Sequence, residues 1–254
     1  MPLIRDRCIC LRKSEYSETS QIVTLLSRDH GLIRAIAKGA HRRTKAGASK
    51  FDGGMDFLEL GEAVFTHEPS RELETLTEWT LREGHLDLRK DLRAMHLAMY
   101  AGELVDKLLE PHDPHPELFD RLEAALPELG TTRREHAFLI FQLELLRETG
   151  YLPEFFACTS CSRPTNGAAP GYFSAQQGGA LCRDCESSFP DRLSIDPRLG
   201  RVVQTILRPP TEPASTPRLV ELTRLHTDPI NQILLAHVQH TLGRPLVMGR
   251  WVSR

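Results

Sequence analysis

Four cysteines in two closely spaced pairs constrain this chain more than any other feature. Cys158 and Cys161 form one C-x-x-C pair, and Cys182 and Cys185 form a second after twenty intervening residues. A C-x-x-C segment can turn so that both sulfurs face one point. Two such turns complete a tetrahedron around Zn²⁺ at about 2.3 Å per bond. The spacing therefore predicts one structural zinc ion per chain, in a module spanning residues 155–190.

Two other interpretations of the cysteines stay open: two structural disulfides, or one redox-active pair. The segment Met1–Arg7 is too charged for a signal sequence, so we expect no oxidising compartment, and a single redox pair leaves the other pair without a role. No apolar run approaches eighteen residues, so we expect a cytoplasmic protein that does not act at a membrane. A four-cysteine site has no open position for water, so we expect it to stabilise the fold and not to catalyse.

Short β-branched and apolar runs fill the first 82 residues. Closure into a small barrel would remove exposed strand edges, and the oligonucleotide-binding (OB) type is the common small version. Cys8 and Cys10 would share one face of the first strand as small buried residues. Thr75, Thr77 and Trp79 would share a face of the last strand. We expect five strands, at Ile4–Leu11, Gln21–Ser27, Leu32–Lys38, Met55–Thr66 and Glu74–Leu81.

From residue 83 onward the apolar period changes to that of helices, so the chain is an α+β, multidomain protein. A five-stranded OB-type barrel (1–82) precedes an α-helical domain (83–254) that the zinc module interrupts. His237 and His240 share one helix face, where exposed or capping roles are more common than a second metal site. The helices are expected at Asp91–Leu109, Pro116–Leu126, Thr132–Thr149, Asp196–Leu207, Pro217–Leu225 and Pro229–Leu242.

Charge inside the barrel domain is segregated although the whole chain has a net charge of only −2. Residues 51–80 contain eight acids and one arginine, whereas residues 34–50 contain six basic residues and no acid. A loop rich in Gly, Ala and Ser that carries such charges can follow a phosphate backbone, although a solvated surface loop is the alternative. The candidate nucleic-acid contacts are Arg34, Lys38, Arg42, Arg43, Lys45 and Lys50, with Lys13 nearby.

Enzyme signatures are weak in this sequence. His115-Pro-Glu117 followed by Cys158-x-x-Cys161 resembles the zinc-deaminase signature. However, Ala157 stands where that signature has Pro, and the second cysteine pair would have no role. There is no P-loop and no G-x-S-x-G motif. We therefore expect a protein that is not an enzyme.

Three stretches resemble the bacterial RecO family of recombination mediators. The first runs from Glu15 to Gly31 and into Ala37–Arg43, and is similar to the family's "Y-x-E…T…G…K/R-G-A-R/K-R" start. The second is the late pair of C-x-x-C motifs among helices. The third is His240–Leu246, similar to the family's "H-L-G…L-K-S" tail. Val247-Met248 departs from the family's Lys-Ser.

This resemblance implies binding to single- and double-stranded DNA, annealing of complementary strands, and action with RecR and single-strand-binding protein. The implied outcome is loading of recombinase onto gapped DNA, at the nucleoid during repair. Candidate residues for the acidic tail of single-strand-binding protein are Arg198, Arg201, Arg218 and Arg224. The rival interpretation is a zinc-stabilised interaction scaffold that does not bind DNA.

Overall fold

The computed structural model describes residues 2–41, 50–51, 54–66, 72–164, 171–207 and 222–253. The chain forms two compact units, Met1–Thr131 and Thr132–Arg254, which are described separately below. The predicted domain boundary after residue 82 stays a prediction. The last strand of the barrel ends at Glu83, whereas the first compact unit continues to Thr131.

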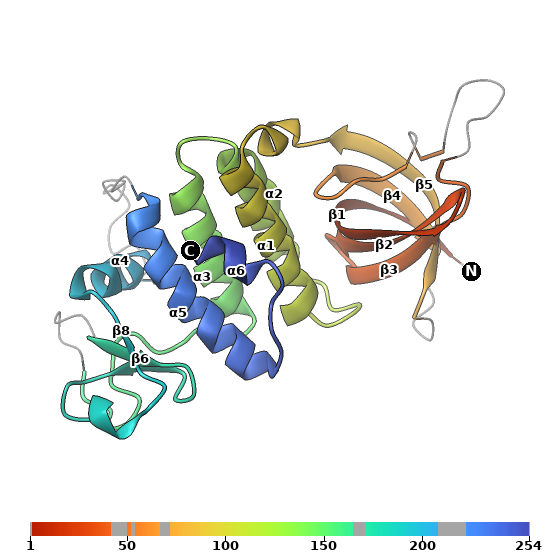
Figure 1. Ribbon diagram of the computed structural model, residues 1–254. Coiled ribbons are helices and arrows are strands. Elements are labelled where there is room, and N and C mark those ends of the chain that lie inside the picture. The colour runs from red at the N-terminus through yellow and green to blue at the C-terminus, as the bar shows by residue number, and fades with distance from the viewer. Residues whose placement is uncertain are drawn as a thin grey trace, which may run out of the picture. The chain divides into compact units, whose positions relative to one another are not determined.

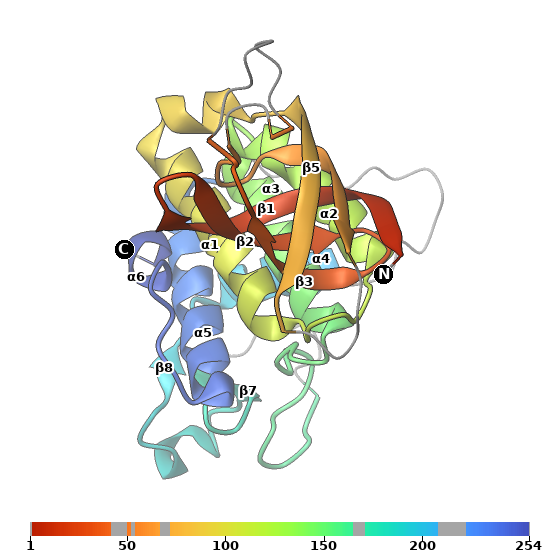
Figure 2. The ribbon, with the colours of Figure 1, turned by 90° about the vertical axis from the view of Figure 1, so that its right-hand side faces the viewer.

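Five strands close into a barrel in the order β1-β2-β3-β5-β4, with β4 returning to β1 (Figure 1). All neighbours are antiparallel except β3 and β5, which pair in parallel through Ala35–Ala37. The closed five-stranded barrel confirms the predicted OB-type architecture (Figure 2). The strands are β1 (Leu3–Ser17), β2 (Ser20–Ser27), β3 (Gly31–Ala37), β4 (Leu60–Thr66) and β5 (Glu74–Glu83).

The barrel interior is one apolar core. Cys8 and Cys10 are fully buried in it and free, as expected for small core residues on one face of a strand. Burial raises the pKa of the Cys10 thiol to about 12, so it stays protonated at neutral pH. The largest buried side chains of this core include Trp79 and Phe65. Gly61 lies against the Trp79 indole ring. A side chain would not fit at this position, because a Cβ atom there would stand 2.5 Å from the ring.

The first strand runs on past the predicted Leu11 to Ser17, and two other strand predictions also need correction. The fourth strand begins at Leu60 and not at Met55, because the preceding segment is held by contacts outside any ladder. The Met55 N–H donates to Gln21 Oε1 at 3.1 Å, and Leu58, with a φ of 63°, donates its N–H to the Cys10 carbonyl at 2.7 Å. These contacts place Met55 and Leu58 in the interior without making them strand residues.

The second correction concerns the faces of β5. Val64 pairs with Glu78, but Phe65 pairs with Leu76, so Thr77 is an extra residue on β5. This bulge puts both Leu76 and Trp79 in the core, whereas the expected face of Thr75, Thr77 and Trp79 does not exist. A bulge breaks the period of two on which the prediction depended.

The first unit also contains two α-helices. Asp91 caps α1 by accepting a hydrogen bond from the Ala94 N–H at 2.9 Å, and Pro116 occupies the first turn of α2. The buried face of α1 is an apolar stripe that includes Leu97, Tyr100, Ala101, Leu104 and Leu108. These helices, α1 (Leu92–Leu108) and α2 (Pro116–Leu129), follow a short 3-10 helix at Leu86–Lys90.

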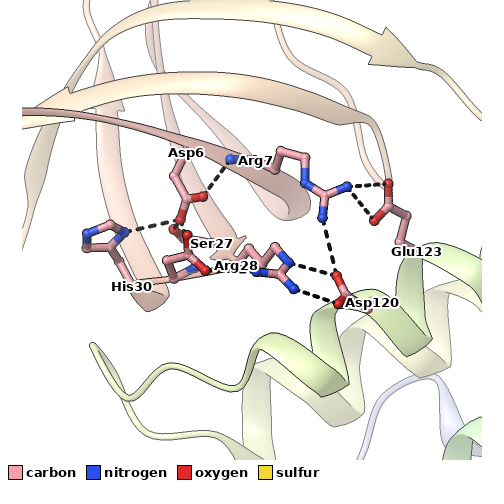
Figure 3. Close-up of polar contacts among 8 residues, drawn as sticks. Asp6, Arg7, Ser27, Arg28, His30, Asp120 and Glu123 are labelled. Atoms are coloured by element: carbon pink, nitrogen blue, oxygen red, sulfur yellow. Dashed lines mark hydrogen bonds and ion pairs between the residues drawn. The ribbon is translucent and has the colours of Figure 1, made fainter.

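Two kinds of contact join this helix pair to the barrel. Gly31 approaches the backbone of Asp113 so closely that a Cβ atom would stand 2.3 Å from the Asp113 carbonyl oxygen. Next to it, the His112 N–H donates to the Leu32 carbonyl at 3.1 Å. Arginines of β1 and of the β2–β3 turn pair with acids of α2 (Figure 3). Backbone contacts and ion pairs therefore join the barrel to these two helices.

The second unit is helical and contains a small sheet. Helix α3 contacts α5, and the buried Thr227 hydroxyl donates to the Glu135 carboxylate between them. Helix α5 begins at Arg224, earlier than the predicted Pro229, because Thr223 and His226 form a capping box. The expected helix at 217–225 lies mostly outside the described residues. The helices are α3 (Arg134–Glu148), α4 (Pro197–Leu207), α5 (Arg224–Leu242) and α6 (Gly249–Val252).

A three-stranded sheet occupies the segment between α3 and α4. Its order is β7-β6-β8, with antiparallel pairs throughout. Gly178, with a φ of 70°, ends the turn between β6 and β7. The sheet confirms that a small cysteine-containing module interrupts the helices. Its strands are β6 (Tyr172–Ser174), β7 (Gly179–Leu181) and β8 (Leu193–Ser194).

Candidate metal centre and nucleic-acid interface

The four predicted metal ligands lie together. The sulfur atoms of Cys158, Cys161, Cys182 and Cys185 are all within 4.8 Å of one another. The Cys161 and Cys182 sulfurs are 3.8 Å apart, which is far longer than a disulfide bond. A tetrahedral zinc site with metal–sulfur bonds of about 2.3 Å has sulfurs about 3.8 Å apart. The residues therefore fit a four-thiolate metal site.

Backbone hydrogen bonds build the two turns that carry these sulfurs. In the first turn, Cys158 donates its N–H to the Arg163 carbonyl at 2.9 Å and accepts from Ser162 at 2.8 Å. In the second, the Cys185 N–H donates to the Cys182 carbonyl at 3.1 Å. Each turn places the two sulfurs of one C-x-x-C pair on the same side. The geometry follows from short-range hydrogen bonds, which explains why the spacing alone could predict it.

The environment favours the thiolate form of one cysteine, Cys158, and the protonated form of another, Cys185. Burial acts to raise the pKa of Cys158, but N–H groups of Cys182, Cys161 and Ser160 lower it to about 6. The Cys182 N–H lies 3.4 Å from the Cys158 sulfur. The Ser160 hydroxyl acts to lower the pKa of Cys185, but the neighbouring thiols raise it to about 12. Because negative charges on neighbouring sulfurs repel one another, ionisation of one thiol makes ionisation of the next less favourable. A bound dication would offset this repulsion and stabilise the thiolates.

His237 supports the module from α5 and does not belong to a metal site. Its Nε2–H donates to the Tyr151 carbonyl at 2.9 Å, and its ring meets the edge of Phe173 at 6.2 Å between centroids. It is 8% exposed, so the expectation of an exposed or capping histidine is wrong here. His240 is exposed. Across the described ranges, the four cysteines form the only cluster of close metal-ligating side chains.

Many cations of the barrel are already paired. Arg28 makes two hydrogen bonds of 2.8 Å to the Asp120 carboxylate, and Arg7 contacts Asp120 at 3.3 Å and Glu123 at 3.1 Å (Figure 3). Asp6 supports this cluster from within the barrel, since it accepts from the Ser27 hydroxyl and the Asp29 N–H. Such arginines are occupied by carboxylates and are less available to other anions.

Two further basic side chains, including one predicted nucleic-acid contact, are also paired with a carboxylate. Lys13 lies 2.9 Å from Asp56, and Arg89 lies 2.7 Å from the same carboxylate. Burial acts to raise the pKa of Asp56, but hydrogen bonds from Lys13, the Phe57 N–H and Arg89 lower it to about 2. Lys13 remains a predicted DNA contact, but it would have to exchange partners to reach a phosphate.

Three predicted cations differ from these. Arg34, Lys38 and Lys50 are exposed, and within the described part of the chain none of them pairs with a carboxylate. Arg34 is the exposed residue of β3, and Lys38 stands in the turn directly after Ala37, the last residue of that strand. The other three predicted contacts, Arg42, Arg43 and Lys45, lie outside the described residues.

A groove lies beside these lysines. It has a volume of about 590 Å³ and is formed by the end of β1, the start of β2, the end of β3 and the segment at residues 50–51. Tyr16, 64% exposed, stands in its wall. Low aromatic content gave no reason to single out this residue, although it lies in the motif that carries the family resemblance. The lining residues are Tyr16, Ser17, Thr19, Ser20, Ile36, Lys38, Gly39, Lys50 and Phe51.

Two models of known protein families match this sequence. The family model "Recombination protein O N terminal" matches residues 1–85, and "Recombination protein O C terminal" matches residues 89–247. The chain belongs to the RecO family. The two matched segments of the RecO models meet between the last barrel strand and α1.

Proteins named DNA repair protein RecO are similar to this chain over most of its length. The protein from Anaeromyxobacter dehalogenans is 32% identical over 254 residues, covering 96% of this chain and 94% of that protein. The protein from Myxococcus xanthus is 31% identical over 246 residues, covering 95% and 93%. The one from Bacillus pumilus is 32% identical over 203 residues, covering 80% and 76%. The names of these RecO proteins indicate no catalytic activity.

No helix in the described part of the chain combines the length and the apolar character that a crossing of the bilayer requires.

Proposed function

We propose that this protein is a non-catalytic recombination mediator that binds DNA and anneals complementary strands. In this proposal it acts in the cytoplasm, at the nucleoid during repair, with RecR and single-strand-binding protein to load recombinase onto gapped DNA. The observation that carries the proposal is a set of exposed cations on the barrel of a RecO family chain, two of them beside the groove. Within the described residues, Arg34, Lys38 and Lys50 pair with no carboxylate, whereas other barrel cations are held by acids.

Phosphate neutralisation would supply the binding energy. Each lysine or arginine that meets a phosphate releases condensed counterions, and this gain does not depend on base sequence. Arg42, Arg43 and Lys45 would add to the three described cations, and Lys13 would join after leaving Asp56. Annealing needs no nucleotide hydrolysis, because base pairing is favourable once the repulsion between two strands is reduced.

The cysteine cluster would hold one structural Zn²⁺ ion. Bound zinc would cross-link the two C-x-x-C turns and stabilise a module whose strands have only two or three residues. Cys158, Cys161, Cys182 and Cys185 would be its ligands. The four thiolates leave no position for a reacting water, so the site would have a folding role.

A basic surface of the second unit would receive the acidic tail of single-strand-binding protein. Arg201 is the best-placed of the predicted residues, since Arg198 is held by Asp196 and Arg224 by Asp228. Arg218 lies outside the described residues. The competing proposal, a zinc-stabilised scaffold without DNA binding, remains an outcome of the experiment below.

The deciding experiment measures anisotropy of labelled single-stranded DNA against salt concentration, with metal-replete protein. If six cations meet phosphates, log K falls against log salt with a slope near −4, from roughly 0.7 per contact. Replacing Lys38 and Lys50 by Gln should reduce the slope by about 1.4.

The matched control is Arg5→Gln with Arg82→Gln, which removes two barrel charges that are paired with Glu62. Its slope should stay near that of the unchanged protein. No binding at low salt would contradict the proposal and favour the scaffold. An equal effect of both double variants would mean that only total charge matters.

A further inference from the structure

We infer that the groove beside Tyr16 is a subsite for one nucleotide of a single strand, with the base stacked on the Tyr16 ring. The phosphate groups on either side of that nucleotide would meet Lys38 and Lys50. The inference rests on the proposed DNA binding and adds a preference of this site for unpaired bases.

The dimensions and lining of the groove fit such a ligand. Its volume of about 590 Å³ falls within the range of about 300–1,000 Å³ that small-molecule pockets occupy. The lining combines one exposed aromatic ring, two ammonium groups and three hydroxyl groups, from Ser17, Thr19 and Ser20. A nucleotide presents the matching chemistry: an aromatic base, an anionic phosphate and a polar sugar. Among the described residues of the lining there is no carboxylate.

The exposure of Tyr16 has no structural explanation within its own unit. Among the described residues of 2–131 it is the only Phe, Tyr or Trp side chain that is classed as exposed, with 64% of its surface accessible. An aromatic ring on an OB-type barrel can stack on any base, because every base has a π face. Its position at the end of β1 places that ring in the groove and not in the core.

The groove is held in shape by the barrel. The Gly39 N–H donates to the Ser20 hydroxyl at 3.4 Å, and the His41 N–H donates to the Thr19 carbonyl at 3.3 Å. On the other wall, the Lys50 carbonyl accepts from the Trp79 N–H at 2.8 Å. These bonds fix the backbone at Lys50 and beside Lys38, and Ser17, next to Tyr16, pairs with Ser20 of β2, so a DNA strand would meet a formed site.

The acid next to Tyr16 is also occupied. Glu15 accepts a hydrogen bond from the Gln21 amide at 3.1 Å, and His41 Nε2 lies 3.0 Å from it. Among the described lining residues the only charged groups are Lys38 and Lys50, which suits a phosphodiester chain, and Glu18, exposed in the turn between β1 and β2, does not line the groove. Lys38 and Lys50 alone would attract any DNA, whereas Tyr16 requires a base that has left the double helix.

This difference defines the experiment. Anisotropy titrations would compare Tyr16→Ala and Tyr16→Phe with the unchanged protein on three probes: oligo(dT), an abasic strand of equal length, and a duplex. Tyr16→Ala should weaken oligo(dT) binding by about 5-fold or more, the usual effect of losing one aromatic–base stack. Binding of the abasic strand and of the duplex should change little, and the salt slope should stay the same. Tyr16→Phe should retain binding, because the ring remains.

A direct contact would appear in fluorescence. With Tyr16→Trp, addition of oligo(dT) should quench emission beyond the change seen for the two native tryptophans, and the abasic strand should not. If Tyr16→Ala binds oligo(dT) as the unchanged protein does, or loses equal affinity for all three probes, the subsite is wrong while phosphate-driven binding stands. If the unchanged protein binds none of the probes at low salt, the proposed function itself fails.

Discussion

The barrel and the cysteine module obtain their stability in different ways. Fourteen of the described residues, including Trp79 and Phe65, form one buried core inside the barrel, and the strands close on themselves. The module has strands of two or three residues and few large buried side chains, chiefly Phe155 and Phe173, which stack at 5.8 Å between centroids. Hydrophobic burial can therefore stabilise the barrel, whereas we expect the module to depend on a metal ion that joins its four cysteines.

Removing one ligand should have the largest effect of any single change. Cys182→Ser leaves three thiolates, and metal binding in small modules of this kind is worth about 10–16 kcal/mol. We expect loss of zinc, measured by atomic absorption, and rapid proteolysis within residues 155–190. The barrel should remain folded, as shown by native-like emission from Trp79 in a Trp251→Phe background.

Cys10→Ala is the matched control for that experiment. It removes a thiol that is buried in the barrel and lies outside the cluster. Zinc content should stay at one ion per chain. Normal zinc content and protease resistance in Cys182→Ser would show that the module does not depend on a metal.

The second largest effect should come from the barrel core. Trp79 is 2% exposed and covers Gly61, so Trp79→Ala leaves a cavity that should cost about 3–5 kcal/mol of unfolding free energy. Urea unfolding followed by circular dichroism would measure the loss. Leu81→Ala, on the same strand but 40% exposed, should cost far less. Loss of zinc from the Trp79 variant would show that the two regions are not independent.

The sequence predicted most of the fold because local signals were strong. Strand runs, proline-bounded helices and the cysteine spacing each depend on neighbouring residues. The failures came from contacts between distant residues. The bulge at Thr77 depends on pairing with β4, and the non-strand segment before Leu60 depends on Gln21 and Cys10. Neither could be seen in a local pattern.

The two candidate sites differ in the same way. The cysteines were found from spacing, since each pair is formed by one turn. The groove joins residues 16–20, 36–39 and 50–51, which only barrel closure brings together. The sequence also did not reveal which basic side chains are paired with acids. Arg7 and Arg28 both pair with Asp120, which is about ninety residues or more away in the sequence. Counting charges along the chain therefore identified a basic region without identifying its available members.

Acid should weaken the module's packing on α5. Burial lowers the pKa of His237 below its ordinary value near 6.5, so the unfolded chain binds the extra proton more readily than the folded one. Stability should therefore fall as pH drops below about 6.5, by at most about 1.4 kcal/mol per pH unit from this group. Urea unfolding at several pH values would measure the slope.

His237→Gln should flatten that part of the profile, while His240→Gln, at an exposed position, should leave it unchanged. Both variants retain the four cysteines, so protonation of metal ligands contributes equally to each. A profile identical in all three proteins would mean that His237 is not the titrating group.

The smallest effect should come from the ion pairs between β1, the β2–β3 turn and α2. Asp120→Asn removes a carboxylate that accepts two hydrogen bonds from Arg28 and one from Arg7, but all three side chains are substantially exposed. Exposed pairs contribute little, so the melting temperature should fall slightly at low salt and the difference should vanish near 1 M salt, where the Debye length is about 3 Å. Gly31→Val tests the neighbouring backbone contact, which has no charge, and its larger loss should persist at every salt concentration. If the Asp120 variant loses as much at high salt as at low salt, then packing and not charge joins the barrel to α2.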